Sequence, residues 1–224
     1  KLSSFSQPFV AGLLTLNTHH PFKTPPDFHV KHPNEQYPIL NSLQYADACL
    51  RTFFKEAARQ SWFQNTLFVI TADHTGPKTV DVRSALDDYR IPIIFYRPDN
   101  SLIGSTDTIL SQIDLMPTLI SMMGLSTEVF SFGQNALDDQ CLHYHIDYKS
   151  GIYQYADNQY CLHFDGTKTI GVFDWQKDQL LTHNLMNNPE LSSVIWNIET
   201  CIKKNIQSYN HAMIHNKMIP DAKK

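Results

Sequence analysis

An aspartate and a histidine stand side by side after a short apolar run, and both side chains suit metal chemistry. Residues 67–70 are rich in β-branched and aromatic side chains, and Asp73 and His74 follow them. This pattern predicts a strand buried on both faces, as in a parallel sheet. Ligands of open α/β sheets bind beyond the carboxyl ends of the strands, where a carboxylate beside an imidazole suits a divalent cation. The simpler interpretation is a turn-capping aspartate beside a solvated histidine.

Two more histidines follow a second apolar run. Residues 8–16 are predicted to form a central strand, and they lead into Asn17-Thr18-His19-His20-Pro21-Phe22. Because Pro21 cannot continue a central strand, both histidines are expected at the carboxyl end of that strand. Histidine there suits acid–base chemistry or anion binding near neutral pH. The alternative is a pair of ordinary loop residues.

Other segments would build the core that positions these side chains. Residues 39–60 show helical spacing, with an apolar stripe made of Leu40, Leu43, Leu50, Phe53 and Ala57. Residues 90–98 predict a third buried strand that ends at a proline. Residues 111–124 predict a helix in which Asp114 caps, Pro117 fits the first turn and Gly124 ends the helix.

Four of these stretches resemble the sulfatase/alkaline-phosphatase superfamily, in the order in which that family carries them. Asp73-His74-Thr75-Gly76 resembles its Asp-His-x-Gly metal motif, and His19-His20-Pro21-Phe22 resembles its substrate-histidine stretch. Residues 90–98 resemble its Arg-x-Pro strand, and residues 112–119 nearly reproduce its Gln-x-Asp-x-x-Pro-Thr-Leu helix. The chain is most similar to the lipoteichoic acid synthase and phosphoglycerol transferase branch, and the resemblance covers most of residues 8–185.

The resemblance implies an α/β fold, namely the C-terminal portion of an alkaline-phosphatase-like α/β/α sandwich with a small antiparallel β subdomain. Residues 1–130 would be the C-terminal part of the sulfatase-like core. Residues 131–210 would form the small sheet and a last helix, and residues 211–224 a polar tail.

The resemblance also implies roles for single residues. Asp73 and His74 match the metal-ligand pair, with Mn²⁺ favoured and Mg²⁺, Ca²⁺ and Zn²⁺ as alternatives. His19 matches the catalytic histidine that contacts the phosphate of the substrate. His20, Thr75 and Lys78 are expected to contact substrate as well.

In that family a threonine nucleophile and a further carboxylate ligand lie upstream of the stretch that begins here. The candidate threonines all fall inside motifs with other roles, so the chain is expected to be the C-terminal half of a catalytic domain; these are Thr15, Thr18, Thr66, Thr71 and Thr75. It begins with Lys1 rather than Met, which also suggests an excised piece. We expect that alone it neither binds metal tightly nor turns over.

The resemblance also implies three binding partners. These are the upstream half of the same domain, a phospholipid-derived or glycan phosphodiester substrate, and a membrane reached through an N-terminal segment outside this chain. The catalytic domain would then be extracytoplasmic, either periplasmic or extracellular.

Two alternatives stand beside a metal-dependent phosphoglycerol transferase. One is a sulfatase or phosphodiesterase of the same fold; a sulfatase needs an upstream Cys or Ser converted to formylglycine. The other is a non-catalytic binding module that kept the scaffold, because fold alone does not fix function.

Composition narrows the class of protein. The 224 residues are 42% hydrophobic and 18% charged, which fits a globular domain and excludes disorder. The net charge is −4 without a basic run, so nothing indicates nucleic-acid binding. No apolar stretch is long enough to span a bilayer.

Short alternating segments after residue 130 predict the small antiparallel sheet. They cover residues 142–148, 152–156, 159–164 and 168–174, with turn signals at Ser150-Gly151 and Asp165-Gly166. The last helix is predicted over 188–210, with Leu191, Ile195, Ile198 and Ile202 on one face.

The four cysteines do not establish a cellular compartment. Cys49 and Cys201 fall on predicted helices and are expected to be buried thiols. Cys141-Leu142-His143 and Cys161-Leu162-His163 would each place sulfur and imidazole on one face of a strand. A zinc site, a disulfide in an exported domain, and two strands with buried thiols all fit this pattern.

Overall fold

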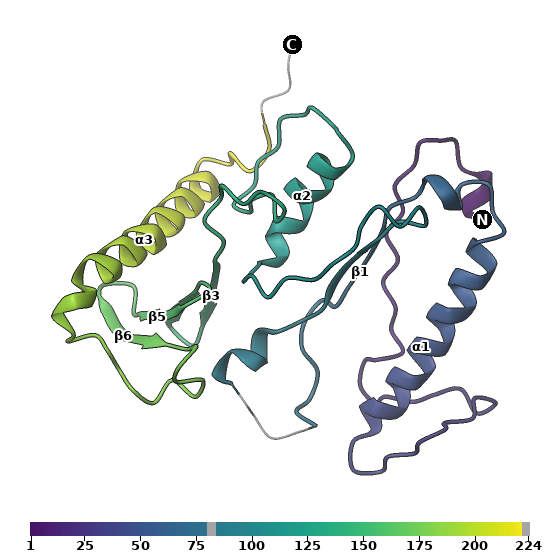
Figure 1. Cartoon of the computed structure of the whole chain (residues 1–224), viewed down its shortest axis with the longest axis horizontal. Coiled ribbons are helices and arrows are strands. Elements are labelled where there is room, and N and C mark those ends of the chain that lie inside the picture. The colour runs from purple at the N-terminus through teal and green to yellow at the C-terminus, as the bar shows by residue number, and fades with distance from the viewer. Residues whose placement is uncertain (80–83, 221–224) are drawn as a thin grey trace. The chain divides into compact units, whose positions relative to one another are not determined.

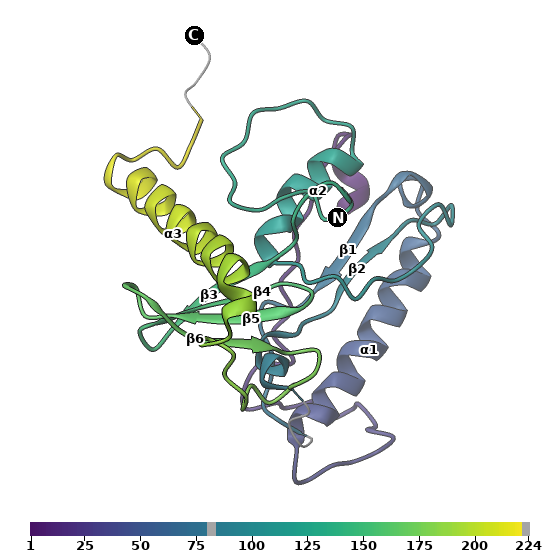
Figure 2. The same ribbon diagram turned by 60° about the vertical axis from the view of Figure 1, so that its left-hand side comes forward.

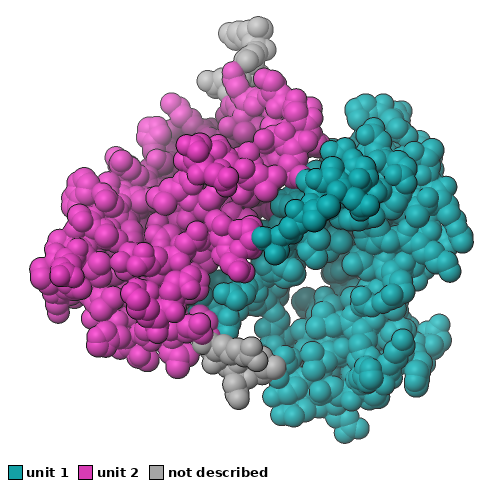
Figure 3. Space-filling model, in the orientation of Figure 1, with its two compact units in different colours: residues 1–82, 86–105 teal, residues 83–85, 106–224 magenta. Residues whose placement is uncertain are grey.

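The computed structural model describes residues 1–79 and 84–220, which form two compact units. The described residues of the first unit are 1–79 and 86–105, and those of the second are 84–85 and 106–220 (Figure 3). The first unit carries Asp73 and His74.

The first unit holds one long helix and a pair of strands (Figure 1). Helix α1 spans Pro38–Ala57, and its proline stands in the first turn, where a missing N–H costs no hydrogen bond. Strands β1 (Phe68–Thr71) and β2 (Ile93–Tyr96) confirm two predicted strands. The expected parallel sheet is wrong here, because the chain turns back after β1 and β2 pairs with it antiparallel. Most residues of β1 are half-buried rather than covered on both faces.

Aromatic rings join α1 to the two strands. Phe54 of α1 lies 5.0 Å from Phe68 and 5.5 Å from Tyr96, measured between ring centroids. Phe68 and Tyr96 are directly paired in the strand register. Buried Trp62 and Phe63 pack around the same rings. Because large aromatic side chains bury much apolar area, this cluster anchors the strand that leads to Asp73.

Two apolar segments that were predicted to be buried are exposed instead. Residues 8–16 form no strand, and the side chains of Val10 and Leu13 are 88% and 84% exposed. A strand forms only through hydrogen bonds to a neighbour, and among the described residues no strand pairs with this segment. On α1, the predicted stripe is also open in part, since Leu43, Leu50 and Phe53 remain exposed.

The second unit is a four-stranded antiparallel sheet covered by a helix (Figure 2). The strands follow in sequence order: β3 (His145–Lys149), β4 (Ile152–Ala156), β5 (Tyr160–Phe164) and β6 (Thr169–Asp174). Helix α3 (Ser192–Ile214) extends beyond the predicted end at residue 210. Ile198 and Ile202 of α3 pack on Tyr155, Leu162 and Val172. The predicted sheet and helix are both confirmed. The strands pair in sequence order because short turns connect them.

Helix α2 (Leu115–Met122) follows a short 3₁₀ turn, Gln112–Asp114. The predicted cap is confirmed at the 3₁₀ turn that leads into α2, where Ser111 and Asp114 form a capping box. The Asp114 carboxylate makes no capping hydrogen bond to α2 itself. It accepts hydrogen bonds from the backbone N–H of Ser111 at 2.7 Å and from that of Gln134 at 2.7 Å. Gly124, with a φ of 64°, adopts the left-handed conformation expected at the end of the helix.

Residues 133–136 pack against the first turn of α2 and the 3₁₀ turn before it. The hydroxyl of Thr118 donates to the carbonyl of Asp114 and accepts from the N–H of Ala136 at 2.8 Å. Gly133 packs so closely that an added Cβ would come within 2.1 Å of the carbonyl oxygen of Ile113. The family-like helix string therefore has a structural role: its Asp and Thr side chains hold a distant loop.

All four cysteines are free thiols. The expectation of a buried thiol is wrong for Cys49, which is exposed on α1, and Cys201 is half-buried. Cys161 is fully buried, and burial raises the pKa of its thiol to about 12. Its sulfur lies 3.8 Å from Nε2 of His163, whereas Cys141 precedes β3 and contacts Asp138.

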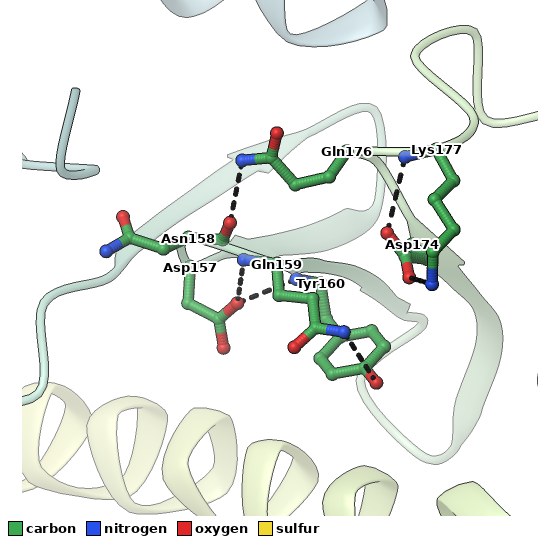
Figure 4. Close-up of polar contacts among 7 residues, drawn as sticks. All are labelled: Asp157, Asn158, Gln159, Tyr160, Asp174, Gln176 and Lys177. Atoms are coloured by element: carbon green, nitrogen blue, oxygen red, sulfur yellow. Dashed lines mark hydrogen bonds and ion pairs between the residues drawn. The ribbon is translucent and has the colours of Figure 1, made fainter.

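The turn between β4 and β5 is tied to the end of β6 (Figure 4). The Asp157 carboxylate accepts from the N–H groups of Gln159 and Tyr160, at 2.8 and 2.7 Å. Beyond β6, Lys177 donates to the Asp174 carboxylate at 2.8 Å. This ion pair closes the turn that follows the sheet.

Replacing Lys177 by methionine should slightly lower the free energy of unfolding at pH 7, because an ion pair with one exposed partner contributes little to stability. The side chain of Asp174 is only 9% exposed, and the Lys177 ammonium lowers the pKa of its carboxyl. A carboxyl with a lowered folded pKa stabilises the fold above its unfolded pKa, and this contribution is lost as the pH falls through the folded value. Urea denaturation from pH 7 down to about 2 should therefore show a flatter acid loss in Lys177→Met. In an Asp174→Asn background the lysine substitution should have no further effect, and an undiminished effect there would contradict the assignment.

Candidate metal centre

The side chains of Asp73 and His74 converge just after β1. Oδ2 of Asp73 lies 3.6 Å from Nε2 of His74, and Oδ1 of Asp73 accepts from the backbone N–H of His74 at 3.0 Å. The two side chains are 70% and 74% exposed. Both potential ligand atoms thus face the same accessible space at the end of the strand.

A backbone contact selects the tautomer of His74. Its Nδ1 lies 2.7 Å from the carbonyl oxygen of Thr75. A carbonyl can only accept, so Nδ1 carries the proton and Nε2 keeps its lone pair in the neutral ring. Metal-binding histidines commonly donate their other ring N–H to a carbonyl or carboxylate in this way.

The geometry fits a divalent ion held by both residues. Two ligand atoms that each lie about 2.1 Å from one cation are roughly 3.0–3.4 Å apart, close to the observed separation. A carboxylate and an imidazole suit Mn²⁺ and Zn²⁺, whereas Mg²⁺ and Ca²⁺ favour oxygen. No cluster of three His, Cys, Asp or Glu occurs within the described ranges 1–79 and 84–220. Asp73 and His74 are thus the two candidate ligands that this part of the protein brings together.

Thr75 and Lys78, which were predicted to contact substrate, both meet Asp88 in the structure. The hydroxyl of Thr75 donates to the backbone carbonyl of Asp88 at 2.8 Å. The ammonium of Lys78 lies 2.9 Å from Oδ1 of Asp88. Thr75 and Lys78 thus both contact one residue, Asp88.

His19 and His20 lie in a tight turn after the exposed segment 8–16. Nδ1 of His19 donates to the carbonyl of His20 at 2.9 Å, which leaves Nε2 of His19 accessible, as in His74. The ring of His20 packs edge-on against Phe22, 5.6 Å between centroids. The side-chain contacts of both histidines stay within their own turn, so Asp73 with His74 is the pair that the described structure brings together.

Sequence reasoning did not identify Asp88. It stands in a short 3₁₀ helix, Ala85–Tyr89, beside another aspartate in a polar stretch, and no periodicity distinguishes it. Its contacts to Thr75 and Lys78 form only when the loop folds back toward the end of β1.

A family model described as sulfatase matches residues 2–125, which is more than half of the 224 residues. The chain belongs to the sulfatase family. The matched range contains β1, β2 and α2 together with His19, Asp73 and His74.

Curated sulfatase-family relatives place the chain in the lipoteichoic acid synthase-like branch of the sulfatase/alkaline-phosphatase superfamily. Lipoteichoic acid synthase 1 of Bacillus subtilis is 28% identical over 181 residues, which are 70% of this chain and 28% of that protein. The lipoteichoic acid synthase of Staphylococcus saprophyticus is 26% identical over 144 residues, 57% of this chain and 22% of that protein. The chain therefore spans about a quarter of the length of these relatives.

Solved structures confirm the alkaline-phosphatase-like α/β fold. An alkaline phosphatase superfamily protein from Vibrio parahaemolyticus superposes with a TM-score of 0.77 at 19% identity, over 98% of this chain and 52% of that one. The lipoteichoic acid synthase LtaP from Listeria monocytogenes gives a TM-score of 0.70 at 21% identity, over 91% of this chain and 53% of that one. The sulfatase-family chain thus corresponds to about half of each solved chain.

Proposed function

We propose that this chain is the metal-binding part of a transferase or hydrolase that acts on a phosphoglycerol-type phosphodiester. The observation that carries the proposal is the convergence of Asp73 Oδ2 and His74 Nε2, 3.6 Å apart, with Nδ1 of His74 held by a carbonyl. The lipoteichoic acid synthases among its relatives support the substrate class.

In this proposal Asp73 and His74 hold one divalent ion, with Mn²⁺ favoured. Such an ion, when bound, neutralises charge on phosphoryl oxygens and lowers the pKa of a coordinated hydroxyl. The exposed Nε2 of His19 donates to a phosphate oxygen of the substrate when the ring is protonated. The nucleophile is a threonine outside this chain that forms a covalent intermediate with the phosphoryl group.

The partner proposed for the first unit is the complementary half of the same catalytic domain. Val10, Leu13, Leu14 and Leu16 are all more than 70% exposed in an apolar run of nine residues, 8–16. Contiguous apolar side chains of this kind mark an interaction surface. The superposed chains are about twice as long as the part that this chain matches, which supports the same division.

We further propose, on the basis of the lipoteichoic acid synthase relatives, that the complete protein is anchored in a membrane with its catalytic domain outside the cytoplasm. None of the helices in the described residues is long and apolar enough to cross a bilayer.

A sulfatase is the second candidate, and the family model favours it. The nucleophile separates the two functions: a threonine supports the phosphodiester reaction, and a formylglycine derived from Cys or Ser supports sulfate-ester hydrolysis. Mass spectrometry of the complete protein distinguishes the two nucleophiles directly.

Replacing His19 by alanine in the complete protein should reduce kcat for a glycerophosphodiester by about 100-fold, the middle of the usual range for one acid–base group. The metal content should stay unchanged, because His19 donates to the substrate and is no ligand. Turnover with Mn²⁺ and metal analysis of the purified variant check both statements. A variant that has lost its metal would show that His19 is a ligand, and unchanged kcat would remove its catalytic role.

A further inference from the structure

We infer that Thr75 is a positioning residue for His74, anchored through its hydroxyl to the backbone of Asp88. The inference rests on the proposed metal centre, and it changes the role expected for Thr75 from contacting substrate to orienting a ligand. Nothing in the sequence motif itself indicates this role, since the third position of Asp-His-x-Gly accepts any residue.

A chain of two hydrogen bonds connects Asp88 to the ligand atom of His74. The Thr75 hydroxyl donates to the Asp88 carbonyl at 2.8 Å, and the Thr75 carbonyl accepts from Nδ1 of His74 at 2.7 Å. The two bonds involve opposite ends of the same residue. Holding the side chain of Thr75 therefore restrains its peptide unit, and the peptide unit fixes the ring of His74.

Two further contacts restrain the residues that form these hydrogen bonds. The Lys78 ammonium pairs with the Asp88 carboxylate at 2.9 Å, which helps to hold the residue whose carbonyl accepts from Thr75. The next residue, Gly76, lies against Ile39 at the start of α1, where an added Cβ would come within 2.7 Å of Cδ1. The residues that follow Asp73 and His74 are thus restrained by the contact of Gly76 with α1 and by the contacts with Asp88.

These contacts leave the hydroxyl of Thr75 with its one proton already donated. A phosphate oxygen only accepts, so the hydroxyl could serve the substrate only by giving up the Asp88 carbonyl. The positive charge of Lys78 is likewise paired with the Asp88 carboxylate. Positioning is the role that keeps every observed contact.

The consequence is a preformed tautomer. With Nδ1 committed to the Thr75 carbonyl, Nε2 stays the free nitrogen beside Oδ2 of Asp73 before any metal binds. Outer partners of metal-binding histidines typically affect metal affinity by 10–100-fold. Because Thr75 acts through its own peptide unit, we expect an effect at the lower end of this range.

The test uses the complete protein with ¹⁵N-labelled histidine, three threonine variants and one histidine variant. Thr75→Val keeps the shape and removes the donor, Thr75→Ser restores the donor, and Thr71→Val removes a neighbouring threonine hydroxyl that donates to the Ala72 carbonyl. Nitrogen chemical shifts of the metal-free protein report the His74 tautomer, with His74→Ala identifying the signal. Titration with Mn²⁺, followed by the electron paramagnetic resonance of the free ion, reports affinity.

We expect Thr75→Val to convert the single Nδ1–H form of His74 into a mixture and to weaken Mn²⁺ binding about tenfold. Thr75→Ser and Thr71→Val should match the original protein in both measurements. An unchanged tautomer and unchanged affinity in Thr75→Val would overturn the inference, and a raised KM alone would show that Thr75 contacts substrate. If the original protein binds no Mn²⁺ but Thr75→Val still alters the tautomer, the proposed function fails while the positioning role stands.

Discussion

Replacing His74 by alanine should lower turnover of the complete protein by at least about a thousandfold. The substitution removes one of the two ligand atoms that converge after β1, Nε2 of His74 beside Oδ2 of Asp73. A metal ion contributes several kcal/mol of charge stabilisation to phosphoryl transfer, and each 1.36 kcal/mol is a factor of about ten in rate. Losing about 4 kcal/mol therefore gives the expected decrease.

Activity and metal content should fall together in this variant. Phosphodiester turnover and Mn²⁺ titration are measured on the same preparation, with His29→Ala as the matched control, because His29 is an exposed histidine of the loop before α1. His29→Ala should behave like the original protein. Near-normal turnover of His74→Ala would remove the metal assignment, and so would full Mn²⁺ binding.

Replacing Asp114 by alanine should destabilise the second unit by about 3–5 kcal/mol. The carboxylate is 6% exposed and accepts from the N–H groups of Ser111 and Gln134. Each hydrogen bond to a charged group contributes about 1.5–3 kcal/mol, and removing the acceptor leaves two backbone donors without a partner. At about 2–4 °C per kcal/mol, the melting temperature should fall by about 10 °C.

Urea denaturation followed by far-ultraviolet circular dichroism measures this effect. Asp107→Ala provides the matched control, because Asp107 is an exposed aspartate of the same unit. It should change the free energy of unfolding by less than about 0.5 kcal/mol. A loss below about 1 kcal/mol in Asp114→Ala would contradict the assigned contacts, since water would then satisfy the same donors.

Local patterns predicted the second unit well. Ser150 and Gly151 both have positive φ angles, 54° and 87°, and the glycine adopts this conformation without a steric cost, as the tight turn between β3 and β4 requires. Alternating side chains then placed Leu162 and Val172 on the face toward α3. The paired strands follow one another in the sequence, so short turns bring them together.

The first unit shows where such patterns are insufficient. The apolar run at residues 8–16 has the composition of a strand, but among the described residues no strand pairs with it. Most of its side chains are exposed, although Phe9 packs against Trp62. Strand composition measures how well side chains fit a sheet; it does not supply the paired backbone. Similarly, residues 67–70 were correctly predicted as a strand, while their antiparallel pairing with β2 depended on the path of the loop.

The sequence by itself determined that Asp73 and His74 lie together at the end of a strand, because adjacent residues after an extended segment cannot separate. It did not determine which nitrogen of His74 is free, or that Thr75 and Lys78 both meet Asp88. Those features depend on carbonyl and carboxylate groups brought close by the tertiary fold, since Asp88 reaches Thr75 across a separation of 13 residues. Residue types specify which chemistry is available, and only the folded loop decides how the ligand is oriented.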